Sequence, residues 1–140
     1  GFKTALFPDA FVYHKRRTSL GKFAKQLMYF GRARVNLSRF HTGQLKPIHF
    51  LPIVFAFGTI LTVVLAALGL LIGYIALGVL IFYLLAVAVG GLIKTKSPGA
   101  ALLIPMVVLI QFFSYSYGLI YEWIRKLRGI DPNTKYIELY

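Results

Sequence analysis

One feature constrains the fold more than any other: a long stretch of the sequence carries no formal charge. Residues 47–93 include no Asp, Glu, Lys or Arg over 47 consecutive positions, and residues 97–121 form a second uncharged run of 25. A helix of about 20 apolar residues crosses the hydrocarbon layer of a bilayer. The first run is long enough for two crossings and the second for one. We therefore predict an all-α integral membrane protein with about three transmembrane helices, near residues 50–71, 74–93 and 98–124.

The residues outside these runs are strongly basic. Sixteen Lys and Arg stand against 4 Asp and Glu, which gives a formal net charge of +12. Such an excess attracts a polyanion, either nucleic acid or anionic lipid. Most of the aromatic residues lie inside the predicted spans, where they cannot stack on bases. We therefore expect membrane lipids as partners, and no nucleic acid.

Shifts in composition divide the chain into four segments. Residues 1–18 are expected to be extended, because Pro8 and Asp9 form a turn signal between two short β-prone stretches. Residues 19–46 are predicted to form an amphipathic helix at the membrane interface and a linker, residues 47–128 the transmembrane region, and residues 129–140 a polar C-terminal tail. Ser97 and Pro98 predict the start of the third span, as N-cap and first helical residue.

The segment after residue 19 has helical periodicity with two unlike faces. The apolar positions at three and four residue steps are Leu20, Phe23, Leu27 and Phe30, and the opposite positions are Lys22, Lys25, Tyr29 and Arg32. An apolar face opposite a cationic face is typical of a helix that lies in the headgroup plane of a membrane. The predicted interface residues are Lys22, Phe23, Lys25, Leu27, Phe30 and Arg32. The alternative is an ordinary surface helix of a soluble domain.

The distribution of Lys and Arg predicts the orientation of the chain, since these residues are retained on the cytoplasmic side. Ten of the sixteen precede the first span, so the N-terminal part is expected in the cytoplasm. Three full spans would then place the C-terminus outside. Arg125, Lys126 and Arg128 favour the cytoplasm instead, and a re-entrant segment within residues 47–93 would satisfy both.

The chain shows no self-contained active site. Its four acids, Asp9, Glu122, Asp131 and Glu138, are too dispersed for paired acid and base catalysis. It has no cysteine, and its three histidines do not form a metal-binding motif. We therefore predict no catalytic residue, no metal site and no cofactor within this chain.

Polar residues gather instead where the extended segment meets the amphipathic helix. The candidates for contact with a substrate or its diphosphate are His14, Arg16, Arg17, Thr18, Ser19, Gln26 and Tyr29. Helix N-termini attract anions, and arginine binds phosphate oxygens through its planar fork. The alternative is that the basic residues only mark the cytoplasmic side of the membrane.

This junction resembles the end of the catalytic domain of membrane-bound, processive-type family 2 glycosyltransferases. The stretches that carry the resemblance are Gly1-Phe2-Lys3, Pro8-Asp9-Ala10, Val12-Tyr13-His14-Lys15-Arg16-Arg17-Thr18-Ser19, Phe23, Lys25-Gln26 and Phe30-Gly31-Arg32-Ala33-Arg34. The stretch Phe113-Ser114-Tyr115-Ser116-Tyr117-Gly118 is similar to a Tyr-Gly pattern in the last span of these proteins.

The resemblance implies the C-terminal part of an enzyme in a bacterial-type inner (cytoplasmic) membrane. The intact enzyme would transfer a sugar from a nucleotide-sugar to a lipid-linked or polysaccharide acceptor. A GT-A domain elsewhere in it would supply an Asp general base and an Asp-x-Asp motif for a divalent metal such as Mg or Mn. Gln26 matches the start of the family's Gln-x-x-Arg-Trp signature, but Tyr29 and Phe30 replace Arg and Trp. This departure favours transfer of a single sugar over processive synthesis.

A function of another class stays open. The chain could be a small non-catalytic basic subunit or scaffold of a larger membrane complex, with its basic arm on anionic lipid or on an acidic partner. That hypothesis predicts copurification with larger proteins.

Two further patterns concern the packing of the spans. Four polar or small residues fall on one face of the third span, namely Gln111, Tyr115, Gly118 and Glu122. Polar groups at membrane depth face protein or water, and we favour helix packing over an acceptor-lipid groove. The pairs Gly69 with Gly73 and Ala86 with Gly90 match the small-xxx-small spacing of closely packed membrane helices.

Overall fold

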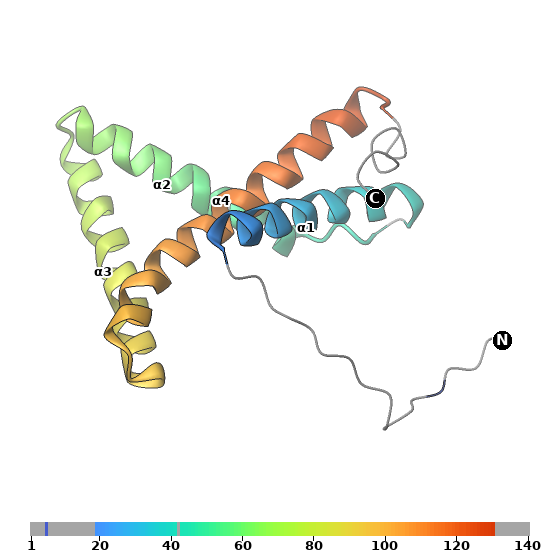
Figure 1. The fold of residues 1–140 in the computed structure, drawn as a ribbon. Helices are drawn as coiled ribbons and strands as arrows, with labels where there is room; N and C mark the ends of the chain where they lie inside the picture. Colours follow the sequence, from blue (N-terminus) through green and yellow to red (C-terminus); the bar gives the residue numbers. More distant parts are fainter. Residues whose placement is uncertain (1–4, 6–18, 42, 131–140) are drawn as a thin grey trace.

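The computed structural model describes residue 5, residues 19–41 and residues 43–130. Within this part of the chain the structure is all helical and has no strand (Figure 1). The elements are α1 (Leu20–Phe40), the 3-10 helix η1 (Pro47–Phe50), α2 (Leu51–Ala67), α3 (Leu71–Thr95) and α4 (Pro98–Leu127). The predicted all-α fold is confirmed. The expected extended segment lies outside the described residues except for Ala5.

Three helices are long and apolar enough to cross a membrane. They are η1 with α2 (21 residues), α3 (25 residues) and α4 (30 residues). In the most apolar part of each helix few residues are buried inside the protein, and none are in that part of α3. At about 1.5 Å per residue, α4 is longer than the hydrocarbon layer is thick. An upright α4 would therefore extend beyond the hydrocarbon, whereas a tilted one would fit within it.

Serine caps begin two of the helices. The Ser19 side chain accepts a hydrogen bond from the Lys22 backbone N–H at 3.3 Å at the start of α1. Ser97 accepts one from the Ala100 N–H at 3.4 Å, and Pro98 is the first residue of α4. These side chains satisfy backbone donors that a helix leaves unpaired. This helix therefore begins at the residues that the sequence predicts.

A glycine in the left-handed region ends α2. Gly69 has a φ of 76°, and the N–H groups of Gly69 and Leu70 donate to the carbonyls of Ala66 and Leu65. This Schellman arrangement favours glycine, which has no Cβ to strain. It stops α2 at Ala67, before the expected limit near residue 71, and α3 begins at Leu71 rather than near residue 74. Gly129, with a φ of 69°, ends α4 in the same way.

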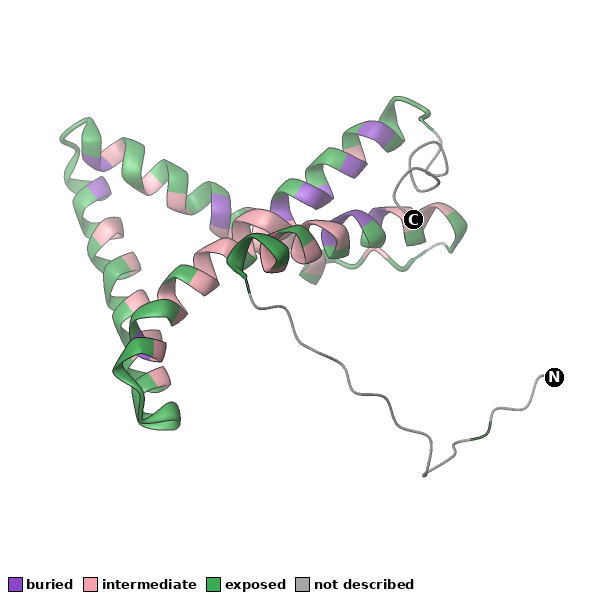
Figure 2. Ribbon diagram, in the orientation of Figure 1, coloured by how far each residue is buried: buried purple, intermediate pink, exposed green. Residues whose placement is uncertain are grey.

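The helices have an open arrangement (Figure 1). The α2 and α3 helices and the first half of α4 outline a triangle, and α1 lies against the second half of α4. Neighbouring helices touch at Gly73 on Ala66, at Gly91 on Ile104, and at Phe55, whose ring centroid is 4.2 Å from that of Phe112. Buried residues concentrate where α1 meets α4 (Figure 2).

Candidate functional site

The α1 and α4 helices cross at two glycines, each of which faces the opposing backbone. A Cβ on Gly118 would collide with the carbonyl oxygen of Met28, and a Cβ on Gly31 would collide with the carbonyl oxygen of Tyr115. Small residues allow such close backbone approach between packed helices. The α1 helix is therefore held directly against α4.

Next to this crossing, one carboxylate is surrounded by three guanidinium groups. Glu122 on α4 is fully buried. Its Oε2 accepts a hydrogen bond from Nε of Arg32 at 3.0 Å, and its Oε1 accepts one from Nη2 of Arg39 at 3.3 Å. Arg125 brings its Nε to 3.8 Å from Oε1. We refer to these four residues as the Glu122 cluster.

The Glu122 cluster is a largely buried ion network. Its arginine side chains are only 10% to 14% exposed, and the carboxylate is not exposed at all. Removing one partner from a buried ion pair leaves an uncompensated charge and is strongly destabilising. Because Arg32 and Arg39 belong to α1 while Glu122 belongs to α4, the cluster fixes α1 to α4.

Aromatic rings cover the guanidinium groups on the outer side of the cluster. The Arg32 guanidinium lies 5.2 Å from the ring centroid of Tyr121 and 5.9 Å from that of Tyr29. The Arg125 guanidinium lies 5.9 Å from the Tyr121 ring. A cation over an aromatic face gains electrostatic attraction, more so when it is desolvated. These rings therefore stabilise the positive charge that the single carboxylate does not balance.

The exposed basic residues have no acidic counterpart on the part of the chain that the structure describes. This part contains eleven Lys and Arg but one acid, Glu122, whose oxygens are already engaged by arginines. Lys22 and Lys25 on α1 are exposed, as are Lys94 in the last turn of α3 and Lys96, its C-cap. An exposed cationic surface without internal counter-charges attracts external anions.

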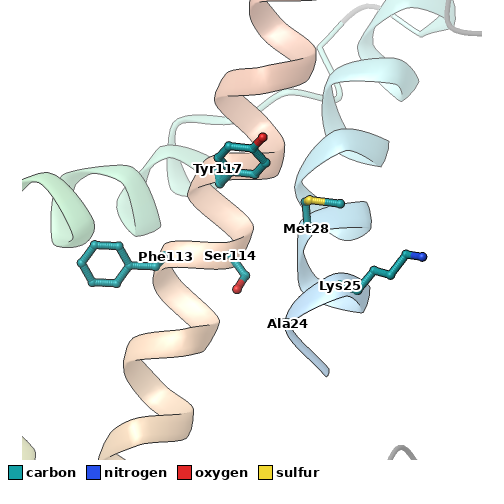
Figure 3. Close-up of a pocket in the computed structure, with 6 residues that line it drawn as sticks. All are labelled: Ala24, Lys25, Met28, Phe113, Ser114 and Tyr117. Carbon is teal, nitrogen blue, oxygen red and sulfur yellow. The ribbon is translucent and has the colours of Figure 1, made fainter. Parts of the chain in front are cut away.

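A groove opens between the N-terminal half of α1 and the middle of α4 (Figure 3). Its volume is about 540 Å³, and its lining residues are Ala24, Lys25, Met28, Phe113, Ser114 and Tyr117. The lining is almost entirely apolar. Lys25 lines one edge, and in Figure 3 its ammonium group points away from α4. The groove therefore combines an apolar interior with a cationic rim.

The structure places the predicted site residues in different surroundings. His14, Arg16, Arg17 and Thr18 lie outside the described residues, and Ser19 is the N-cap of α1. Gln26 and Tyr29 are half-buried on α1, and Tyr29 contacts both Arg32 and Lys25, whose Nζ lies 5.8 Å from the ring centroid. These residues do not form a common cavity within the described chain.

The predicted interface residues also separate into two groups. Lys22, Lys25 and Phe30 are exposed, and Phe23 and Leu27 are half-buried. Arg32, which the periodicity places on the basic face, is instead buried against α4. A helical wheel of α1 alone places Arg32 on the outward, basic face. In the structure this part of α1 faces α4, because α4 supplies the Glu122 carboxylate there.

Packing accounts for part of the polar face expected on the third span. Gly118 and Glu122 face α1, and Tyr115 is half-buried there, whereas Gln111 is exposed. Sequence reasoning missed Gly31, Val35 and Arg39, which form the α1 side of this contact. A signal was present: Arg32 and Arg39 are seven residues apart, two helical turns on one face.

Neither a metal site nor a known relative helps to identify the function of this site. No group of three or more His, Cys, Asp or Glu among the described residues could hold a metal ion, so the divalent metal that the resemblance implies has no fitting site there. No family model matches the chain, and no curated protein or solved structure is significantly similar to it.

Proposed function

We propose that this chain is the C-terminal membrane region of a family 2 glycosyltransferase that moves a sugar from a nucleotide-sugar to a lipid-linked or polysaccharide acceptor. Its part in that reaction is to anchor the catalytic domain at the membrane and to contribute cations to the donor diphosphate. One observation carries the proposal. The stretch that resembles the end of the catalytic domain leads directly into α1, and α1 is fixed to α4 by the Glu122 cluster.

The fixed position of α1 supports a positioning role. A catalytic domain that ends at residue 18 would inherit the location of α1, because only the N-cap Ser19 separates the two. Holding a catalytic group in one geometry relative to its substrate contributes to rate. The Gly31 and Gly118 contact and the ion pairs of Glu122 resist rotation of α1 about α4. The orientation of the domain over the membrane then follows from helix packing.

His14, Arg16 and Arg17 are the residues that we assign to the phosphate groups. Arginine forks match phosphate oxygens and keep their charge at every physiological pH. These residues precede the first turn of α1, where the helix dipole also favours an anion. The net charge of +12 means that the surrounding field attracts such an anion as well.

The proposal is tested on membranes that contain the intact gene product. We expect transfer of a sugar from a nucleotide-sugar, and an Arg16→Ala, Arg17→Ala pair that raises the KM for the donor at least about tenfold, since a hydrogen bond to a charged group contributes ~1.5–3 kcal/mol. The matched control is Lys94→Ala, Lys96→Ala, which removes two exposed lysines at the α3–α4 connection. Wild-type membranes without transfer or nucleotide-sugar hydrolysis would refute the proposal, and copurification with larger proteins would then favour the subunit hypothesis.

We also infer the membrane orientation that this function needs. Arg32 and Arg39 on α1 contact Glu122 near the end of α4, and the Phe50 ring at the start of α2 lies 4.9 Å from that of Trp123. Since we expect α1 at the membrane interface, the end of α4 that contacts it lies at that same interface. The chain therefore crosses an even number of times between α1 and the end of α4, which leaves one of the three long helices short of a full crossing.

Two groups of basic residues support a cytoplasmic location for this shared face in an inner membrane. Ten Lys and Arg precede η1, and Arg125, Lys126 and Arg128 end α4, so both groups favour the same side. Because the chain has no cysteine, single cysteines at Ser19 and Gly129 can be labelled with a membrane-impermeant maleimide. We expect labelling of both from the cytoplasmic side. Labelling from opposite sides would contradict the inference. Labelling of single cysteines at Gly69 and Thr95 then shows which helix does not cross the membrane.

A further inference from the structure

The groove between α1 and α4 has the features of a site for an amphiphile. Five of its six lining residues, all except Lys25, offer no formal charge, and it is open along one side (Figure 3). Its volume of about 540 Å³ lies within the range of small-molecule sites. Lys25 lines one edge, and its side chain carries the ammonium outward, away from α4. Long basic side chains adopt this arrangement where an apolar layer meets a polar one.

The charge at the rim identifies the headgroup of such an amphiphile. Lys22 is exposed and lies three residues before Lys25, so both ammonium groups stand on the same side of α1. No carboxylate within the described chain pairs with either lysine, because Glu122 is enclosed by its arginines. A phosphodiester with two acyl chains would supply both the missing negative charge and an apolar group for the groove.

We propose that the α1–α4 groove binds one acyl chain of an anionic glycerophospholipid, with its phosphate at Lys22 and Lys25. The lipid covers an apolar surface of α1 and α4 that no other described element covers, and it neutralises lysines that have no acidic partner among the described residues. This site is independent of glycosyl transfer, since it needs only that α1 lie at the membrane face. Loss of lipid binding and loss of enzymatic activity are therefore separate results.

The proposal is tested by fluorescence quenching with the 140-residue chain in vesicles. Trp123 is the only tryptophan. Trp123→Phe removes the background signal and Tyr117→Trp places a reporter in the lining of the groove. The vesicles consist of phosphatidylcholine and contain a small, fixed fraction of a lipid that is brominated on its acyl chains. This brominated lipid is either phosphatidylglycerol or phosphatidylcholine. We expect brominated phosphatidylglycerol to quench the reporter more strongly than brominated phosphatidylcholine at equal mole fraction.

Three variants distinguish binding in the groove from general electrostatic attraction to the membrane. Lys25→Gln should weaken the apparent binding of phosphatidylglycerol about fivefold, the effect of one cation near an anionic leaflet. Lys94→Gln, Lys96→Gln removes two exposed cations far along the chain and should leave the binding unchanged. Ala24→Phe keeps every charge but fills the groove, so it should reduce quenching by both lipids. Far-UV circular dichroism establishes that each variant retains its helix content.

Several results would overturn the proposal. These are equal quenching by the two lipids, an effect of the Lys94 and Lys96 pair as large as that of Lys25, and unchanged quenching in Ala24→Phe. Displacement of the brominated phosphatidylglycerol by a much smaller fraction of a polyprenyl phosphate would assign the groove to an acceptor lipid instead.

Discussion

Replacing Glu122 by Gln should release α1 from α4. The substitution keeps the size of the side chain but removes the only carboxylate among three arginines whose side chains are 10% to 14% exposed. Breaking a buried ion pair from one side costs about 3–5 kcal/mol, because the remaining charge stays desolvated and unpaired. The docking equilibrium of α1 should therefore shift by a factor on the order of a hundred to several thousand.

The shift can be measured as a distance between two labels. Because the chain has no cysteine, spin labels can be attached at exposed Ala33 on α1 and exposed Ile120 on α4. Titration with SDS and electron spin resonance then give the populations of docked and released α1. The matched control is Lys126→Gln, which removes only the exposed hydrogen bond from Lys126 to Ser38 at 3.0 Å. That change should cost at most ~1 kcal/mol.

A double-mutant cycle tests whether the loss comes from the ion pair itself. Glu122→Gln and Arg32→Gln together should cost less than the sum of the two single changes, by about 1 kcal/mol or more, since residues in one network are coupled. The reasoning is refuted if Glu122→Gln releases α1 no more than Lys126→Gln does, or if the effects of the two cluster variants simply add.

Three further substitutions test the helix contacts and the turn. Gly118→Leu should undock α1 at a cost of ~3 kcal/mol or more, measured by the same labels, whereas Gly78→Leu, in open space, should have no effect. Gly73→Leu should open the α2–α3 hairpin, because a side chain there meets the backbone of Ala66; crosslinking between α2 and α3 would reveal it. Gly69→Ala should lower the free energy of unfolding in SDS by about 1 kcal/mol, since its φ of 76° disfavours any residue with a Cβ; an unchanged unfolding midpoint would contradict this.

The pattern of glycines illustrates where sequence reasoning reached its limit. The small-xxx-small spacing pointed to Gly69 with Gly73 and to Ala86 with Gly90. Gly73 does pack closely on Ala66, whereas Gly69 ends a helix and a Cβ on Gly90 would meet open space. The closest approaches involve Gly73, and also Gly31 and Gly118, which are distant in sequence and match no spacing rule together. A spacing pattern describes one helix, whereas close approach is a property of two.

The sequence by itself determined the helices. Residues 47–93 and 97–121 cannot leave backbone groups unpaired in an apolar layer, so helix formation and approximate span limits follow from a one-dimensional pattern of charge. Ser97 and Pro98 fixed a helix start for an equally local reason. Only the tertiary structure decided that Arg32 turns inward. Its partner, Glu122, is ninety residues away, and a helical wheel cannot show which face of α1 another helix will cover.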